Sequence, residues 1–477
     1  MLNLLSLPDE ILLLILSNFA GHYMFKEELL ALCLASKRFC SIAQPFLYSQ
    51  YVREVHCQCC HTHAAPPGRL VPLILFTRTL VSRPDLAARV QTAKFDLAMD
   101  EFDDDDVREV ELDADTFKVL SDGFLKLPVE FRVDNFSDAV SMCSNPWLLL
   151  LAAHMPNLQN LQLTIAEEGL RDLDPVFAKR PNLGVEQPYF KSLKSIVIRD
   201  LARSENEYLT IIDSVIELPQ LEDFTLINVN GDAYGCPLLG LKPKSLNISK
   251  LSLFEACIDT ERLEALIKGC KCLKEFNYRG NNFYAHGILE SCQFKPEHLL
   301  TILDSQKDSL HTIRCNLDWD KVESSVSKCW PKYGSFESFT SLHHLSLDQY
   351  PYAPDTELPA SLHCLTIANI GFPIFDVVRS LQVRKSSGSE SNVHNMLPNF
   401  KCLILVPSDD NPTGMLDVEE KYDWNGDFDN VKKLDKFDLA CDKLWEISRE
   451  CRFSVDVMHE VWDLFWDSRD DIDPLSP

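Results

Sequence analysis

The sequence predicts an α/β protein in which an N-terminal three-helix module is followed by a long, irregular array of parallel strands with helices outside them. Three observations lead to this prediction. An unbroken apolar segment, Ile11 to Leu16, lies close to the N-terminus. Apolar residues at positions n, n+3 and n+5 recur nine times between Leu158 and Leu405. Segments with the apolar spacing of helices separate several of these recurrences.

The first helix is expected to begin at Pro8 and to be closed by Gly21. Proline suits the first turn, where its missing N–H is no loss, and Asp9 and Glu10 complement the positive end of the helix dipole. Six apolar residues follow and surround the helix axis, so no side of that segment is purely polar. The segment is too short to cross a bilayer. We therefore expect one side to pack inside the module and another to meet a partner.

Two further helices complete the expected module. The second begins near Lys26 and carries Leu29, Leu32 and Ala35 on one side. Ser36 to Phe39 marks the turn into a third element. That element contains Ile42, Pro45, Leu47 and Tyr48.

These residues resemble the F-box, the short helical module by which substrate receptors dock on the adaptor of cullin–RING ubiquitin ligases. Phe39 stands where the family commonly has tryptophan, and Ala35 replaces a larger aliphatic residue. The alternative is an ordinary helical hairpin. The matching residues are Leu7, Pro8, Glu10, Ile11, Leu12, Ile15, Leu29, Leu32, Ala35, Ser36, Lys37, Phe39, Ile42, Pro45 and Leu47. The resemblance implies that the adaptor contacts Leu7, Pro8, Ile11, Leu12, Ile15, Leu32, Phe39 and Pro45.

A helical linker is expected after the module. Pro72 to Val81 has helical spacing and leads toward a strand at Ala93 to Leu97, a join that looks like that of fungal members of the family. His56 to His63 is rich in cysteine and histidine. A closed zinc site normally joins two separated ligand pairs, and no second pair follows, so we expect no metal.

The recurring pattern predicts one short strand per repeat. Residues n+3 and n+5 point to one buried side, and n turns in beneath them. Helical patterns at Glu207 to Leu218 and Glu261 to Cys270 fall between strands. This arrangement resembles a leucine-rich-repeat solenoid with uneven intervals; the alternative is a doubly wound α/β domain. The nine sets begin at Leu158, Leu193, Leu221, Ile248, Leu273, Leu310, Leu342, Leu362 and Phe400.

Residues at n+2, n+4 and n+6 are expected to face outward and to form the substrate-binding side of the array. They carry both charges and do not identify a ligand. Arginine is over-represented at binding hot spots, so Arg279 and Arg314 are the expected main contributors. The candidate substrate-binding residues are Glu275, Asn277, Arg279, Arg314, Asn316 and His344.

The charge of the chain is concentrated in acidic segments. The net charge is −26, which disfavours binding to nucleic acid and to anionic membranes. The expected organisation is an F-box at 1–50, a linker at 51–92, the solenoid at 93–457 with acidic insertions near 100–115 and 408–430, and a capping helix with a tail at 458–477. Trp462 and Trp466 could instead bind a partner from that last helix.

No motif points to catalysis or a cofactor. Phosphate-binding glycine motifs and the GxSxG nucleophile motif are absent from the sequence. The 17 cysteines, without a secretory signal, indicate reduced thiols and a cytoplasmic or nuclear protein. The resemblance implies a non-catalytic receptor that binds the adaptor, through it a cullin, and an unknown protein substrate. The alternative function is an F-box–adaptor scaffold outside a ligase.

Overall fold

The chain forms two compact units, Met1–Ile227 and Asn228–Ile472. The computed structural model describes residues 6–18, 25–52, 70–96, 112–127, 145–165, 177, 189–200, 215–228, 230–231, 240–258, 260–280, 296–316, 332–348, 352–353, 356–370, 377–378, 380–381, 397–407, 449 and 453–457.

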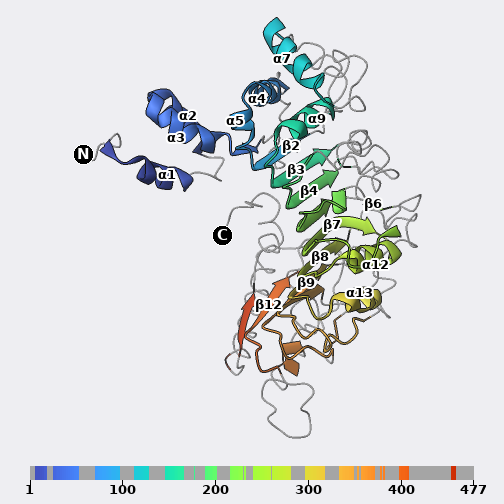
Figure 1. Ribbon diagram of the computed structural model, residues 1–477. Coiled ribbons are helices and arrows are strands. Elements are labelled where there is room, and N and C mark those ends of the chain that lie inside the picture. The colour runs from blue at the N-terminus through green and yellow to red at the C-terminus, as the bar shows by residue number, and fades with distance from the viewer. Residues whose placement is uncertain are drawn as a thin grey trace, which may run out of the picture. The chain divides into compact units, whose positions relative to one another are not determined.

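The first unit begins with three helices and continues into parallel strands (Figure 1). Its strands pair in chain order, β1-β2-β3-β4-β5, and every pair is parallel. Its helices are α1 (Asp9–Ser17), α2 (Lys26–Ala35), α3 (Lys37–Leu47), α4 (Leu70–Ser82), α5 (Pro84–Ala87), α7 (Ala114–Phe124) and α9 (Asn145–His154). Its strands are β1 (Gln50–Val52), β2 (Thr92–Asp96), β3 (Asn160–Ile165), β4 (Ser195–Asp200) and β5 (Asp223–Ile227).

The second unit has the same construction. Its strands pair in the order β7-β8-β9-β10-β11-β12-β13, and β6 pairs with β7. Each new strand joins the same edge, whereas a doubly wound sheet reverses its order, so the doubly wound alternative is wrong. Its strands are β6 (Asn230–Gly231), β7 (Lys250–Ile258), β8 (Glu275–Gly280), β9 (Thr312–Asn316), β10 (His344–Asp348), β11 (Cys364–Ile370), β12 (Cys402–Pro407) and β13 (Ser454–Val457). Its helical segments are α12 (Thr260–Gly269), α13 (Pro296–Leu303) and the 3₁₀ helix η8 (Asp304–Gln306).

The nine predicted recurrences are all strands, and their apolar positions form the core. Residues at n are no more than 2% exposed, and those at n+3 and n+5 no more than 4%. In register, Phe276 lies beside Leu251 on one side and Ile313 on the other. The three apolar residues of each set are therefore buried by the sets on the neighbouring strands, as expected for stacked repeats. The predicted α/β architecture is confirmed.

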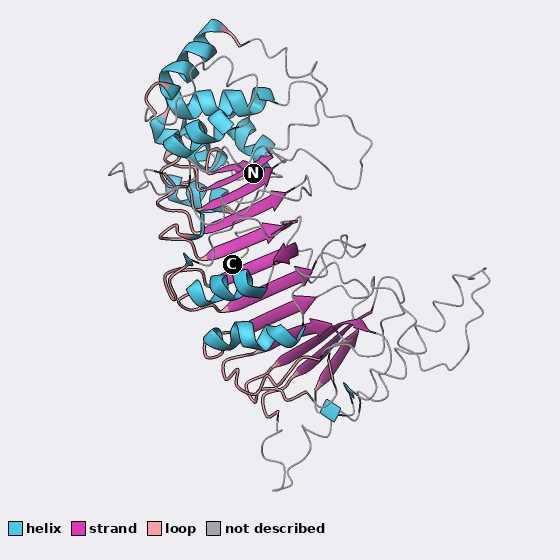
Figure 2. Cartoon of the chain, turned by 90° about the vertical axis from the view of Figure 1, so that its right-hand side faces the viewer, coloured by secondary structure: helices cyan, strands magenta, loops and turns pink. Residues whose placement is uncertain are grey.

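Among the described residues of the second unit, helices precede some of the strands. The helices α12 and α13 lie along one flank of β7 to β9 (Figure 1), as Figure 2 also shows, and they precede β8 and β9. The residues described before β10 (332–343) and β11 (356–363) form turns instead. Tyr333, Phe336 and Phe339 are at most 4% exposed and fill the core there. The rest of these two intervals, residues 317–331, 349–351 and 354–355, lies outside the described residues.

Several boundaries differ from those expected. The helix α1 ends at Ser17, before Gly21, and Pro8 is its extended N-cap residue rather than its first helical residue. The strand β1 was not predicted; it begins at the last residue of the expected F-box, extends into the expected linker and pairs with β2, which was expected at Ala93 to Leu97. Asp113, at the end of the acidic segment, caps α7 by accepting hydrogen bonds from the Thr116 N–H and hydroxyl. Residues 97–111, 408–448 and 458–477 lie outside the described residues.

One buried amide joins three neighbouring segments of the second unit. Gln306 is 3% exposed. Its Nε2 donates to Ile267 O at 3.0 Å and to Cys270 O at 2.8 Å, and its Oε1 accepts from Leu273 N at 3.0 Å. It thereby satisfies carbonyls at the end of α12, which have no partner within that helix.

Replacing Gln306 by leucine should destabilise the second unit. The substitution keeps the volume approximately constant but leaves the Cys270 carbonyl and the Leu273 N–H buried without partners and removes one of the two donors to the Ile267 carbonyl, which should cost about 3 kcal/mol. Hydrogen exchange of α12 and β8 amides measures the change. Lys307→Leu is the control, because Lys307 is partly exposed and pairs with exposed Asp304. Equal protection in both variants would contradict the role assigned to Gln306.

Candidate protein-interaction surfaces

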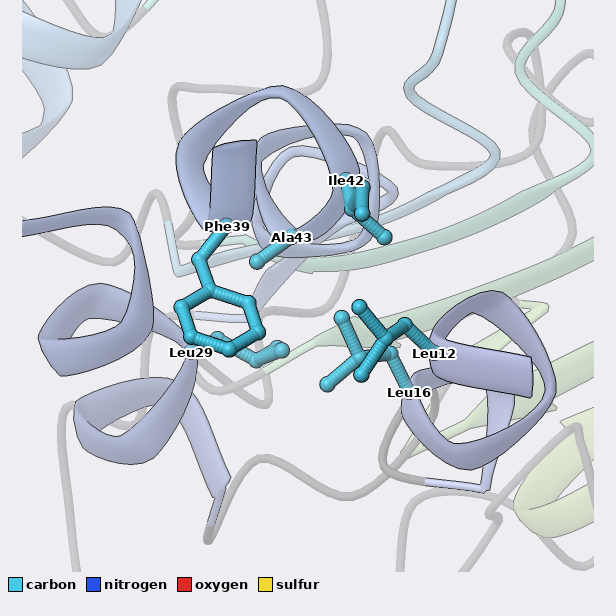
Figure 3. Close-up of a cluster of buried hydrophobic side chains, with 6 residues drawn as sticks. All are labelled: Leu12, Leu16, Leu29, Phe39, Ile42 and Ala43. Atoms are coloured by element: carbon cyan, nitrogen blue, oxygen red, sulfur yellow. The ribbon is translucent and has the colours of Figure 1, made fainter. Parts of the chain in front are cut away.

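The three N-terminal helices share one small apolar core. Figure 3 shows side chains from all three helices pointing toward one another. Leu12 and Leu16 of α1 face Leu29 of α2, and all three pack against side chains contributed by α3. The α3 residues in this core are Phe39, Ile42 and Ala43, the last fully buried. Because Leu12 and Leu16 are spaced i, i+4, they define the inward side of α1.

Local hydrogen bonds fix the ends of these helices. Ser36 is the N-cap of α3, and its Oγ accepts from Phe39 N at 3.1 Å. Arg38 donates to the Asp9 carboxylate, with Nη2–Oδ1 at 2.6 Å, and to the Leu7 carbonyl. These contacts join the start of α3 to the start of α1. The exposed ion pair adds little stability by itself, so the apolar core carries most of it.

The outward sides of α1 and α2 expose large apolar side chains. On α1, Ile11 and Leu13 are each 42% exposed and Leu14 is 64% exposed. On α2, Leu30 is 49% exposed and Leu34 is 79% exposed. Single exposed apolar side chains are ordinary, but five of them on two short helices that already bury a core form a candidate binding surface. We call these five residues the apolar surface.

The structure separates the predicted adaptor-binding residues into three groups. Leu12 and Phe39 belong to the core, so they hold the helices together and present little surface to a partner. Pro8 and Ile11 are exposed. The remaining predicted residues, which are partly buried, are Leu7, Ile15, Leu32 and Pro45. Sequence reasoning missed Leu13, Leu14, Leu30 and Leu34, although the i, i+4 pair Leu12 and Leu16 would have marked the opposite side of α1.

Burial affects the acidity of one thiol beside this core. Burial raises the pKa of Cys33 to about 11, and the charge and hydrogen bond of Cys40 act in the same direction. In the second unit, burial raises the pKa of Cys270 to about 12. A thiol with such a pKa is protonated at neutral pH, and only the thiolate attacks or binds metal well.

The helical module continues into the sheet through a short aromatic junction. Ser49 O accepts from Gln91 N at 2.8 Å and from Thr92 N at 3.2 Å, which places β1 against β2. The Tyr51 ring stacks on Phe76 of α4 with centroids 4.1 Å apart. Lys26 Nζ of α2 donates to Val52 O at 2.9 Å. Two residues, Tyr48 and Ser49, separate α3 from β1, and these contacts leave that connection little freedom.

The predicted substrate-binding residues lie on neighbouring strands β8, β9 and β10 of the second unit. Asn277 Nδ2 donates to Ser252 Oγ of β7 at 2.9 Å, and Arg314 Nη1 donates to Asn277 Oδ1 at 2.9 Å. Asn277 and Asn316 are only 4% and 6% exposed, while Glu275 and Arg279 are partly exposed. Arg314 is thus partly exposed and oriented by a polar ladder that crosses three strands.

His344 lies beside this ladder on β10, one strand from Arg314. Burial lowers its pKa, and the charges of Arg314, His343 and His363 lower it further, while Glu275 opposes them. The imidazole is therefore neutral at pH 7 and offers one donor and one acceptor nitrogen.

Two further kinds of site are absent from the part of the chain that the structure describes. They contain no group of three or more His, Cys, Asp or Glu able to hold a metal ion. None of their helices has the length and apolar character needed to cross a membrane. The cysteine- and histidine-rich segment His56 to His63 and the helix proposed around Trp462 and Trp466 fall outside the described residues.

Comparison with known proteins identifies the N-terminal module. The F-box-like family model matches residues 4–54. The matched region contains α1, α2, α3 and β1. No curated protein matches the chain. The chain therefore has an F-box-like domain at its N-terminus, followed by parallel strands with helices.

Two alanine substitutions on α1 should reduce the stability of the module by very different amounts. Leu16→Ala removes a side chain that is 4% exposed, and such deletions cost about 2–5 kcal/mol. Leu14→Ala, at 64% exposure, should cost less than about 0.5 kcal/mol. Hydrogen exchange of α3 amides measures both. Similar losses of protection in the two variants would contradict the assigned core.

Proposed function

We propose that this protein is the substrate receptor of an SCF-type ubiquitin ligase: its F-box-like domain docks on the ligase adaptor, and its repeats hold a protein substrate. The main support for this proposal is the apolar surface of α1 and α2, which lies within the region that matches the F-box-like family. F-box proteins are generally non-catalytic receptor subunits, and we propose the same for this protein.

In this proposal, the adaptor covers the five residues of the apolar surface. Leu14 and Leu34 are the most exposed of the five and should contribute the most buried apolar area, at about 25 cal/mol per Å². Leu12 and Phe39 would act indirectly by fixing the positions of α1 and α3. Pro8 and the partly buried Leu7, Ile15, Leu32 and Pro45 would complete the contact at its margin.

The mechanism is proximity. A receptor raises the effective concentration of a substrate lysine near the ubiquitin-carrying enzyme that a cullin recruits. This requires a stiff connection between the adaptor and the bound substrate, since a loose one lowers the effective concentration. The stacking of Tyr51 on Phe76 and the pairing of β1 with β2 support such a connection within the first unit.

The proposed substrate site is the polar ladder of β7 to β9 with the residues around it. Arg314 is held by Asn277, which lowers the entropy lost when its guanidinium binds a ligand. Guanidinium groups bind carboxylates and phosphates through paired hydrogen bonds. We therefore propose that Arg314 and the partly exposed Arg279 contact an acidic or phosphorylated segment of the substrate, with Glu275, Asn277, Asn316 and His344 supporting them.

Co-purification decides between this function and a scaffold outside a ligase. A ligase receptor should carry both the adaptor and a cullin from cytoplasmic or nuclear extracts, where we propose that it acts. Recovery of the adaptor without a cullin would favour the scaffold.

Charged residues in the apolar surface should abolish adaptor binding. In Leu14→Glu/Leu34→Glu, each carboxylate would be buried without a partner, and the cost of several kcal/mol should weaken binding at least about 100-fold. The control is Leu125→Glu, since Leu125, the C-cap residue of α7, is 58% exposed and lies outside the module. Calorimetric titration with purified adaptor measures the difference. Undiminished adaptor binding by the folded double variant would contradict the docking proposal.

Charge reversal at the proposed substrate site should remove substrate capture. The Leu14→Glu/Leu34→Glu chain should retain substrates without passing them to the ligase, so Arg279→Glu and Arg314→Glu are added to it. Proximity labelling should then lose its most enriched proteins, while thermal stability changes little. Arg89→Glu is the control, because Arg89 is an exposed arginine of the first unit. Unchanged enrichment would place recognition elsewhere.

A further inference from the structure

A column of basic side chains runs along the starts of five neighbouring strands in the second unit. Each residue directly precedes its strand: Lys274 before β8, His311 before β9, His343 before β10, His363 before β11 and Lys401 before β12. Lys274, His311 and Lys401 are exposed, and the other two are partly exposed. We call these five residues the basic column.

The backbone fixes the spacing of this column. His311 O accepts from His343 N at 2.9 Å and from His344 N at 3.0 Å, and His343 O accepts from His363 N at 2.8 Å and from Cys364 N at 3.0 Å. Parallel strands lie about 4.8 Å apart. The rings follow this spacing, with centroids 5.4 Å apart for His311–His343 and 4.8 Å for His343–His363.

Hydrogen bonding also sets the tautomer of one ring. His363 Nδ1 lies 2.8 Å from Ser361 O. A carbonyl only accepts, so Nδ1 carries the proton, and Nε2 is the nitrogen that gains a proton when the ring becomes charged. His343 and His363 meet edge to face, at 83°. Three rings in this arrangement do not converge on one point, in agreement with the lack of a metal-binding group among the residues described.

Charged groups of both signs surround the column. Burial lowers the pKa of His343, and the charges of His363 and His311 lower it further. The groups that act on the neighbouring His344 are Arg314, His343, His363 and one acid, Glu275. On the turn before His311 stand Asp304, which pairs with Lys307 Nζ at 3.0 Å, and Asp308. The column itself contains no acid.

We propose that the basic column binds an acidic segment of the substrate laid across the starts of β8 to β12, and that it holds this segment more tightly as the pH falls from 7.5 to 5.5. The identification of the partner as the substrate rests on the proposed function. The binding of an acidic chain does not. A segment running across the strands meets a basic group at intervals of about 5 Å, and its carboxylates accept charge-assisted hydrogen bonds from each.

Overall charge favours a protein ligand over nucleic acid or a membrane. The chain has a net charge of −26, so the basic column is a locally basic region of an acidic protein. Polyanions with a high charge density need many neutralising contacts and would be repelled by the remaining surface. A short acidic peptide can match five basic groups without meeting the rest.

The direction of the pH effect follows from the histidines. An isolated histidine has a pKa near 6.5, and the lowered pKa of His343 means that its charged form is disfavoured in the free protein. Bound carboxylates stabilise the charged form and raise that pKa, so binding takes up protons. Affinity therefore increases as the pH falls, while Asp and Glu side chains, with pKa values near 4, stay charged down to about pH 5.5.

Fluorescence anisotropy of the full-length chain with a fluorescein-labelled decaglutamate peptide tests the proposal. At low salt, we expect the Kd at pH 5.5 to be about tenfold lower than at pH 7.5, as two or three exposed charge pairs would give. His343→Gln/His363→Gln should remove most of this pH dependence. Lys274→Gln/Lys401→Gln should weaken binding at both pH values and reduce its sensitivity to salt.

A matched control variant and a competition experiment complete the test. His298→Gln alters a partly exposed histidine of α13 that lies near Glu297 and outside the column, so it should bind like the original chain. Unchanged pH dependence in the folded His343→Gln/His363→Gln variant would overturn the proposal, as would stronger competition by single-stranded RNA or phosphatidylserine vesicles than by unlabelled peptide. Adaptor binding by these variants reports on the proposed function separately.

Discussion

The residue before each strand supplies the hydrogen-bond acceptor on which the order of the repeats depends. Its carbonyl accepts two N–H groups from the start of the next strand, as Gln159 O does from Lys194 N at 2.7 Å and Ser195 N at 3.0 Å. The same pattern occurs at Ser49 in the first unit and at Lys274, His311 and His343 in the second. Because this contact fixes register, equivalent positions of successive repeats line up. Apolar positions then form a continuous core, and polar positions form columns.

The sequence predicted the architecture well because the core follows a strict local rule. The spacing n, n+3, n+5 is visible without any knowledge of the fold, and every recurrence became a strand. Segments without that spacing were harder to predict. The strand β1 is three residues long, and its role depends on β2, about forty residues away. In the β9–β10 interval, Tyr333, Phe336 and Phe339 fill the core without lying in a helix or strand, although their i, i+3, i+6 spacing would also suit a helix.

The binding surfaces were less predictable, because exposure is a property of the packed molecule. Leu12 and Leu14 are equally apolar in sequence, yet one is 3% exposed and the other 64%. The distinction requires knowing that α3 packs on the side of α1 that carries Leu12. Likewise, His311, His343 and His363 are separated by unequal intervals in the sequence and become neighbours only through strand register. Arg314 was expected to face outward, but its hydrogen bond to Asn277 could not be inferred from spacing alone.

The two-residue connection between α3 and β1 has a consequence for the modularity of the protein. Side chains in a strand alternate between faces, so a slip of β1 by one residue against β2 would turn Tyr51 away from Phe76 and Phe95, whose ring centroids lie 4.1 and 5.4 Å from its own. The F-box-like domain is therefore not an interchangeable cassette. A chimaera joining it to another repeat array would have to carry β1 and its aromatic contacts along. Insertions during evolution should be tolerated between repeats and excluded at this boundary.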